Sequence, residues 1–271
     1  MLLRRPVVTL ALLTAATFTA HASEREFSYT YDSSVLAPGQ KELELWGTYG
    51  TGRDYYYRSF TERIEFEYGV AENVQTAIYL NFASITSDSE GTGIIQKDKV
   101  NGMSWEWKWK LSDASVDSIG SALYIEPEVS GQEVALELKG IIDKRIGKEL
   151  FAFNFTVEPE WELEPSQPKP EIHAETNLGW SHRLNGGFSF GLELRTTSET
   201  VYSTDDEAWE IENIVVYGGP TVHFAKNGFW TTLTVMPQWF APKNEAGNSN
   251  PNREAIGANA LEVRALIGFD L

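Results

Sequence analysis

FTERIEFEY at residues 60–68 and WEWKWKL at residues 105–111 alternate apolar and polar side chains almost without interruption. In the first stretch Ile64 and Phe66 fall on one face, and Arg63, Glu65 and Glu67 fall on the other. A period of two is typical of a β-strand that hides one face, whereas a helix needs apolar residues three and four apart. Helical spacing is nearly absent from the chain, so the sequence predicts an all-β protein.

The same alternation continues to the end of the chain and predicts about twelve strands. We expect them at residues 41–50, 57–69, 74–85, 101–111, 119–129, 134–144, 149–161, 171–183, 188–198, 212–225, 229–240 and 259–271. The links between them are short and long in turn, with short links such as 226–228 and long ones such as 86–100 and 241–258. Tight periplasmic turns and longer outer loops give this pattern in outer-membrane proteins. It favours a single up-and-down antiparallel transmembrane β-barrel at residues 41–271 over a soluble sandwich.

Aromatic residues near the strand ends support the barrel, because outer-membrane barrels carry aromatic girdles at both lipid interfaces. Tyr68 and Trp180 lie beside short turns, and Tyr49 and Trp239 lie near long loops. The chain also ends on an alternating apolar strand, as do barrels that the assembly machinery of the outer membrane recognises. We therefore expect this machinery, outer-membrane lipid and lipopolysaccharide as partners.

Composition excludes several other classes. The 271 residues include 39 acidic and 22 basic side chains, for a formal net charge of −17, which would repel nucleic acid. There is no cysteine, so disulfides, thiolate metal sites and cysteine nucleophiles are excluded. A mean hydropathy of −0.30 is too polar for a bundle of membrane helices.

The N-terminal residues have the features of a secretory signal peptide. Arg4 and Arg5 precede an apolar stretch, and Ala20-His21-Ala22 has the form of a signal-peptidase site, so residues 1–22 are predicted to be a cleaved signal peptide. Residues 23–40 are left outside the barrel strands. They either form a periplasmic tail, fold into the lumen as a plug, or pair with a barrel end through the alternating aromatic residues at 27–31.

The lumen is where function is expected. Strand phase turns thirteen glutamates and six basic residues inward, and an excess of carboxylates favours cations along any water path. The predicted lining of the lumen and its mouth is Glu65, Glu67, Glu106, Glu126, Glu128, Glu158, Glu160, Arg63, Lys108, Arg195 and Arg264. Glu126-Pro127-Glu128 and Glu158-Pro159-Glu160 rise toward the outer loops, where each proline predicts a bulge or strand end and the glutamates an acidic collar. A twelve-strand barrel is narrow, so these side chains could fill it or leave a gated pore.

Several motifs resemble those of a group of poorly characterised porin-like outer-membrane β-barrels of proteobacteria. The resemblance rests on Tyr29-x-Tyr31, Leu36-Ala-Pro-Gly39, Glu42-x-Glu44-x-Trp46 and Glu65-x-Glu67-Tyr-Gly-Val-Ala-Glu-Asn73. It implies a barrel in the outer membrane and supplies no catalytic residues to carry over, so it bears on fold and location more than on activity.

The sequence contains no pattern typical of an enzyme active site. The expected mature chain has three histidines, His173, His182 and His223, without a suitably spaced serine, and neither G-x-S-x-G nor H-E-x-x-H occurs. The acidic stretch 205–207 lacks the spacing of a calcium loop. We expect no metal or cofactor, and a porin-like passive channel or small-solute transporter; the alternative is a closed structural or adhesive barrel acting through its outer loops.

Overall fold

A computed structural model describes residues 24–88, 91–93, 95–163, 170–203 and 207–271. The predicted signal peptide and residues 205–206 of the acidic stretch 205–207 lie outside these residues. Twelve strands form: β1 Lys41–Thr51, β2 Tyr57–Ala71, β3 Val74–Ser87, β4 Gln96–Ser112, β5 Gly120–Ser130, β6 Glu133–Ile146, β7 Glu149–Glu162, β8 Pro170–Arg183, β9 Phe188–Ser203, β10 Ala208–Lys226, β11 Phe229–Lys243 and β12 Leu261–Asp270, with a short 3₁₀ turn, η1 Asn185–Gly187. The prediction of an all-β chain of about twelve strands is confirmed.

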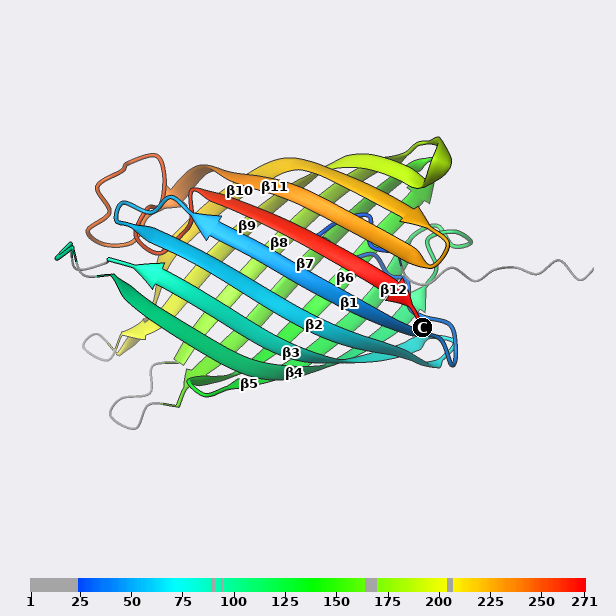
Figure 1. Ribbon diagram of the computed structural model, residues 1–271, viewed down its shortest axis with the longest axis horizontal. Coiled ribbons are helices and arrows are strands. Elements are labelled where there is room, and N and C mark those ends of the chain that lie inside the picture. The colour runs from blue at the N-terminus through cyan, green and yellow to red at the C-terminus, as the bar shows by residue number, and fades with distance from the viewer. Residues whose placement is uncertain (1–23, 89–90, 94, 164–169, 204–206) are drawn as a thin grey trace, which may run out of the picture.

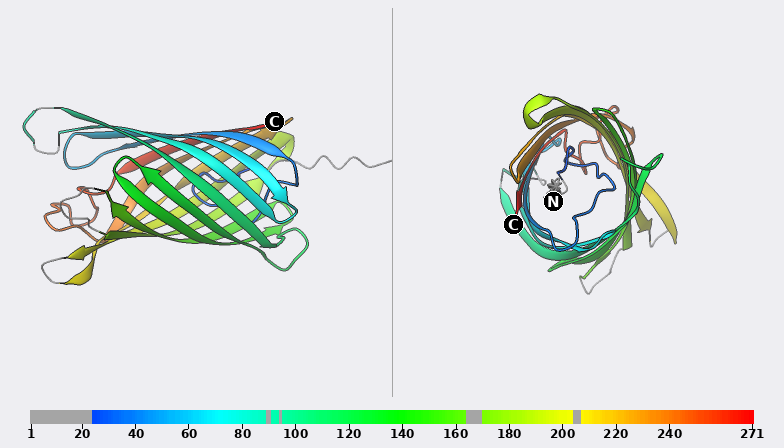
Figure 2. Two further views of the ribbon diagram at one scale, coloured as in Figure 1. Left: turned by 90° about the horizontal axis from the view of Figure 1, so that it is seen from below. Right: turned by 90° about the vertical axis from the view of Figure 1, so that its right-hand side faces the viewer.

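Each strand pairs with its neighbours in the chain, and β1 pairs with β12, so the sheet closes into an antiparallel barrel (Figure 1). The closing seam runs continuously from Glu42 opposite Asp270 to Thr51 opposite Leu261. The strands are steeply tilted, and the C-terminus lies at the end that carries the short turns (Figures 1 and 2). The single up-and-down barrel predicted from the loop lengths is therefore present.

Several hairpins extend further than the apolar alternation indicated. The β3–β4 hairpin continues to Ser87 opposite Gln96, and β9–β10 continues to Ser203 opposite Ala208. Polar residues beyond an apolar band can still join the backbone ladder, because ladder hydrogen bonds do not need an apolar side chain. Hydrophobic periodicity therefore placed these strand ends too early.

The barrel is apolar outside and polar inside. Ile64 and Phe66 of β2 are about 40% exposed on the outer surface, whereas Glu65 and Glu67 between them are buried. This inversion of a soluble core is what a lipid-facing wall with a polar lumen requires. Among the described residues, no helix is long and apolar enough to cross a bilayer.

Asn227 and Gly228 make the turn between β10 and β11, with φ angles of 55° and 76°. Positive φ at both central residues is the condition for the tightest hairpin turn, and Asn-Gly adopts it with little strain. Sequence alone was less accurate at the prolines. The sequence predicts a bulge or a strand end at each proline. The β5–β6 and β7–β8 ladders cross Pro127 and Pro159 without a register shift, and each strand continues three residues further, so neither feature lies at these prolines. The register shifts in the β10–β11 ladder lie at Val216 and Tyr217, opposite Phe240 and Gln238. Both prolines are accommodated within continuous strands.

Candidate functional site: an occluded lumen

The chain that precedes β1 lies inside the barrel. Seen along the barrel axis, the segment before β1 loops across the lumen (Figure 2, right). Phe27, Tyr29 and Leu36 are at most 3% exposed, and Phe27 packs with Leu150 and Ala152 of the inner wall. Phe27 to Leu36 therefore lie within the lumen (Figure 2). We call residues 24–36 the lumen segment.

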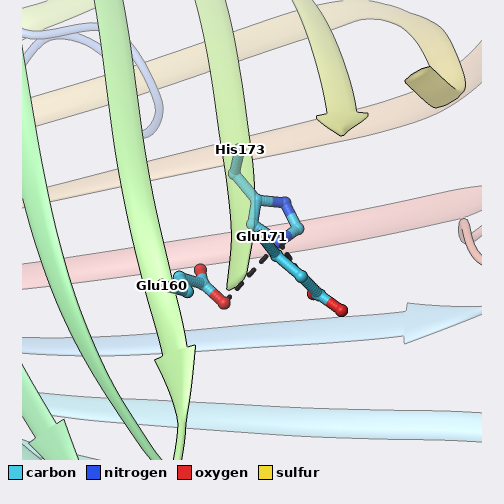
Figure 3. A group of neighbouring side chains, drawn as sticks. All are labelled: Glu160, Glu171 and His173. Atoms are coloured by element: carbon cyan, nitrogen blue, oxygen red, sulfur yellow. Dashed lines mark ion pairs between the residues drawn. The ribbon is translucent and has the colours of Figure 1, made fainter. Parts of the chain in front are cut away.

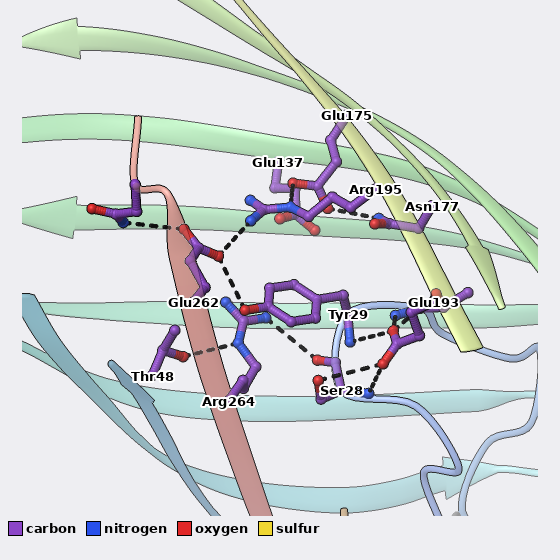
Figure 4. A network of polar contacts seen from close by, with 12 residues as sticks. Ser28, Tyr29, Thr48, Glu137, Glu175, Asn177, Glu193, Arg195, Glu262 and Arg264 are labelled. Carbon is purple, nitrogen blue, oxygen red and sulfur yellow. Dashed lines mark hydrogen bonds and ion pairs between the residues drawn. The ribbon is translucent and has the colours of Figure 1, made fainter. Parts of the chain in front are cut away.

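One carboxylate holds the middle of the lumen segment. The backbone N–H of Ser28 donates to Glu193 Oε1 at 3.0 Å, and those of Tyr29 and Thr30 donate to Oε2 at 2.8 and 2.9 Å (Figure 4). Thr234 of β11 donates to Oε1 at 2.7 Å, which fixes the carboxylate from the wall side. Successive amides that converge on one anion form a strong, charge-assisted contact. Strand phase had turned Glu193 inward, but its role depends on a segment far away in sequence.

Two uncharged wall residues also bind the lumen segment. Asn154 of β7 accepts from the Tyr31 N–H at 2.6 Å and donates to the Tyr31 carbonyl at 2.9 Å. Gln75 of β3 accepts from the Leu36 N–H at 2.9 Å. An amide side chain at an inward position was the only sequence signal for Asn154 and Gln75. An uncharged amide on the inner face is equally typical of a lumen that simply contains water, so this signal does not identify a partner for the segment.

Glu26 attaches the beginning of the lumen segment to the short-turn end of the barrel. Its carboxylate accepts from Ser181 at 2.6 Å, from Arg183 at 2.7 Å and from Arg145 at 3.0 Å. Burial works to raise the pKa of Glu26, but the Ser181 hydrogen bond and the two guanidinium charges outweigh it and hold this pKa below the ordinary 4.5. Glu26 is therefore an ionised anchor at neutral pH.

Cations stack on aromatic rings at the level of Tyr29 and Tyr31. Arg264 lies 3.8 Å from the Tyr29 ring centre, and Arg25 and Lys139 each lie 3.9 Å from that of Tyr31. Contacts of this length are attractive, more so where water is excluded. Wall carboxylates balance several of the cations, in the ion pairs Arg63–Glu126, Lys139–Glu137, Arg195–Glu175 and Arg195–Glu262. The lumen segment and the wall together therefore form a dense polar layer across the barrel (Figure 4).

The predicted lining residues are on the inner wall but in different environments. Glu65, Glu67, Glu106, Glu126 and Lys108 are buried, while Glu128, Glu158, Glu160, Arg63, Arg195 and Arg264 are half-buried. The four glutamates of the expected collar differ in their partners. Glu126 is bonded to Arg63 and Tyr124, whereas Glu128 and Glu158 have no ion-pair partner among the described residues.

Two cavities lie on either side of the lumen segment. The cavity toward the long loops has a volume of about 420 Å³. Tyr29 and Tyr31 of the lumen segment line it, as do Glu128 and Glu158 of the wall. The other, about 490 Å³, is lined by residues 32–35 and by turn and strand residues at the short-turn end, among them Asp113. Tyr29 to Val35 thus separate an outer vestibule from an inner one.

The three histidines lie in separate places. His173 at the long-loop end lies 3.6 Å from Glu160 and 3.9 Å from Glu171 (Figure 3). The ring of His182 is 2.5 Å from Glu149, and buried His223 contacts Thr232 at 2.8 Å. The ligand atoms of the His173 group are close enough to share a metal ion, but half-exposed ion pairing already accounts for the group.

A closed antiparallel barrel with an apolar outer surface and a polar lumen is the architecture of outer-membrane β-barrel proteins. Residues 19–271 match the family of unknown function DUF6662, and the chain belongs to this family. No curated protein sequence matches it.

Solved outer-membrane channels share the fold. The COG4313 outer membrane channel from Pseudomonas putida F1 superposes with a TM-score of 0.64 at 9% identity, over 89% of this chain and 98% of that one. The NanC porin (TM-score 0.53, 9% identity, 84% and 100% covered) and the KdgM porin (TM-score 0.51, 6% identity, 85% and 99% covered) are also similar. At these sequence identities the similarity extends to the barrel fold and says nothing about which solute, if any, this protein transports.

Proposed function

We propose that this protein is a passive channel of the bacterial outer membrane for small solutes, that its lumen favours cations, and that the lumen segment closes it. The observation that carries the proposal is the pair of vestibules, one at each end of the barrel, separated by Tyr29 to Val35 together with the wall side chains at the same level. The channel folds that superpose on the chain support the same conclusion.

Charge supports the preference for cations. Arg63, Lys139 and Arg195 at the outer vestibule each pair with a wall glutamate. The charged residues that remain there without an ion pair among the described residues include Glu128, Glu133 and Glu158 on one side and Arg264 on the other, which leaves an excess of carboxylates. Unpaired carboxylates in a low-dielectric passage keep a negative potential that salt screens only in part. Small cations are therefore the solutes that this vestibule concentrates.

We also propose that the protein is located in the bacterial outer membrane. A cleaved signal peptide at residues 1–22 would deliver the chain to the periplasm, where the assembly machinery would recognise β12, and the apolar outer wall would then face lipid and lipopolysaccharide. An enzyme is not expected.

Planar-bilayer recording of the folded, full-length mature protein tests the function. We expect rare openings that pass K⁺ in preference to Cl⁻, measured as a reversal potential in a salt gradient. If neither the wild type nor a variant with a weakened lumen segment conducts at any voltage, the channel proposal fails. The occluded lumen would then favour the alternative, a closed barrel that acts through its outer loops.

A further inference from the structure

Five glutamates gather on the inner wall beneath the lumen segment. Glu42 and Glu44 of β1 lie directly opposite Glu67 and Glu65 of β2, and Glu106 of β4 lies beside them. All five are at most 5% exposed. Ligand oxygens of Glu42, Glu44 and Glu67 lie within 4.8 Å of one another, as do those of Glu65, Glu67 and Glu106, so Glu67 belongs to both groups.

Four of these carboxylates keep one oxygen free, whereas both oxygens of Glu106 accept hydrogen bonds, from Gln75 and Tyr79. The indole of Trp230 donates to Glu42 Oε1 at 2.6 Å, that of Trp46 to Glu44 Oε2 at 2.8 Å, and Gln75 to Glu67 Oε1 at 2.8 Å. The other oxygens, Glu42 Oε2, Glu44 Oε1 and Glu67 Oε2, together with Glu65 Oε2, are buried and accept no hydrogen bond from any described residue. Donors that hold one oxygen while the second stays free are typical of carboxylates that bind a metal.

The positive charges at the cluster are fewer than the carboxylates. Arg25 of the lumen segment lies 3.6 Å from Glu44, and Lys108 follows Glu106 on the inward face of β4. Two cations face five carboxylates, and a buried excess of charge without compensation is very costly. The free oxygens need a further positive charge.

We propose that this cluster, centred on Glu67, binds a hard divalent cation, Ca²⁺ or Mg²⁺. The donors are all carboxylate oxygens, which such ions prefer, and no nitrogen or sulfur ligand is present in either trio. Oxygens within 4.8 Å of one another fit around one Ca²⁺, whose Ca–O distances are about 2.3–2.6 Å. The cation is bound by carboxylates of the barrel wall, so its binding does not depend on whether the lumen conducts.

Terbium luminescence tests the site, because Tb³⁺ takes the same oxygen ligands and emits when a nearby indole transfers energy to it. Trp46 and Trp230, the two buried tryptophans, are hydrogen-bonded to the cluster itself. Folded, EDTA-treated full-length protein at pH 7 should give saturable Tb³⁺ emission on tryptophan excitation, and Ca²⁺ should displace it. Calorimetry with Ca²⁺ alone gives the stoichiometry.

The variant Glu67→Gln keeps the side-chain size and removes the carboxylate common to both trios, so affinity should fall by at least about tenfold. Glu72→Gln, in the exposed turn between β2 and β3, is the matched control and should bind as the wild type does. Heat-modifiable migration on SDS gels verifies the fold of each variant. The proposal is overturned if folded wild type binds neither ion, which would leave protons as the neutralising charge, or if Glu67→Gln binds as tightly as the wild type.

Discussion

Replacing Glu193 by Gln should open the channel. The carboxylate accepts three successive backbone N–H groups of the lumen segment, all at 3.0 Å or less. A hydrogen bond to a charged group contributes about 1.5–3 kcal/mol and a neutral one about 0.5–1.5 kcal/mol. Gln has a single acceptor oxygen, so the Tyr29 and Thr30 bonds can persist in the neutral form, weakened by about 1 kcal/mol each, while the Ser28 bond is lost at a cost of about 2 kcal/mol. The closed state therefore loses about 4 kcal/mol, which corresponds to about a thousandfold change in the closed-to-open ratio.

Single-channel recording measures this ratio directly as the fraction of time spent open. Glu128→Gln is the matched control, because it removes one lumen carboxylate that has no hydrogen bond to the lumen segment among the described residues. It should alter selectivity and leave the open fraction nearly unchanged. An open fraction in folded Glu193→Gln equal to that of the wild type would refute the idea that this carboxylate holds the channel shut.

Four other outcomes are expected. Ile64→Lys should cost about 2–4 kcal/mol in urea unfolding from lipid vesicles, and Glu65→Lys on the inner face should cost less; equal costs would contradict the face assignment. The double variant Glu128→Gln, Glu158→Gln should move the reversal potential toward zero, and an unchanged value would exclude these residues as the source of selectivity. Because the pKa of Glu26 is held below 4.5, its anchoring is complete above that pH and is lost as the pH falls through the lower folded value. Acid should therefore increase the open fraction, and less so in Glu26→Gln, whose anchor is already weakened; the same acid response in both proteins would count against this role. Unheated protein should migrate faster than boiled protein on SDS gels and should fractionate with outer membranes, whereas recovery from the soluble periplasm would contradict the location.

Sequence reasoning succeeded where the information is local. Side chains two residues apart in a strand share a face, so the phase of β2 alone placed Ile64 outside and Glu65 inside. It failed for the lumen segment, whose path depends on contacts between residues far apart in the chain, such as Tyr31 with Asn154. Arg25 was overlooked for the same reason, since no periodicity connects it with the carboxylates of β1.

The contacts of the lumen segment also determine when it can become ordered. It bonds to Gln75 of β3, Asn154 of β7, Glu193 of β9 and Glu262 of β12, which lie around the circumference of the barrel. These partners converge on one space only after β12 has joined β1. Ordering of the segment must therefore follow closure of the seam, and it is a late event of assembly. In a chain that has not closed, the segment remains open to proteolysis, so its protection reports that the last pair of strands has formed.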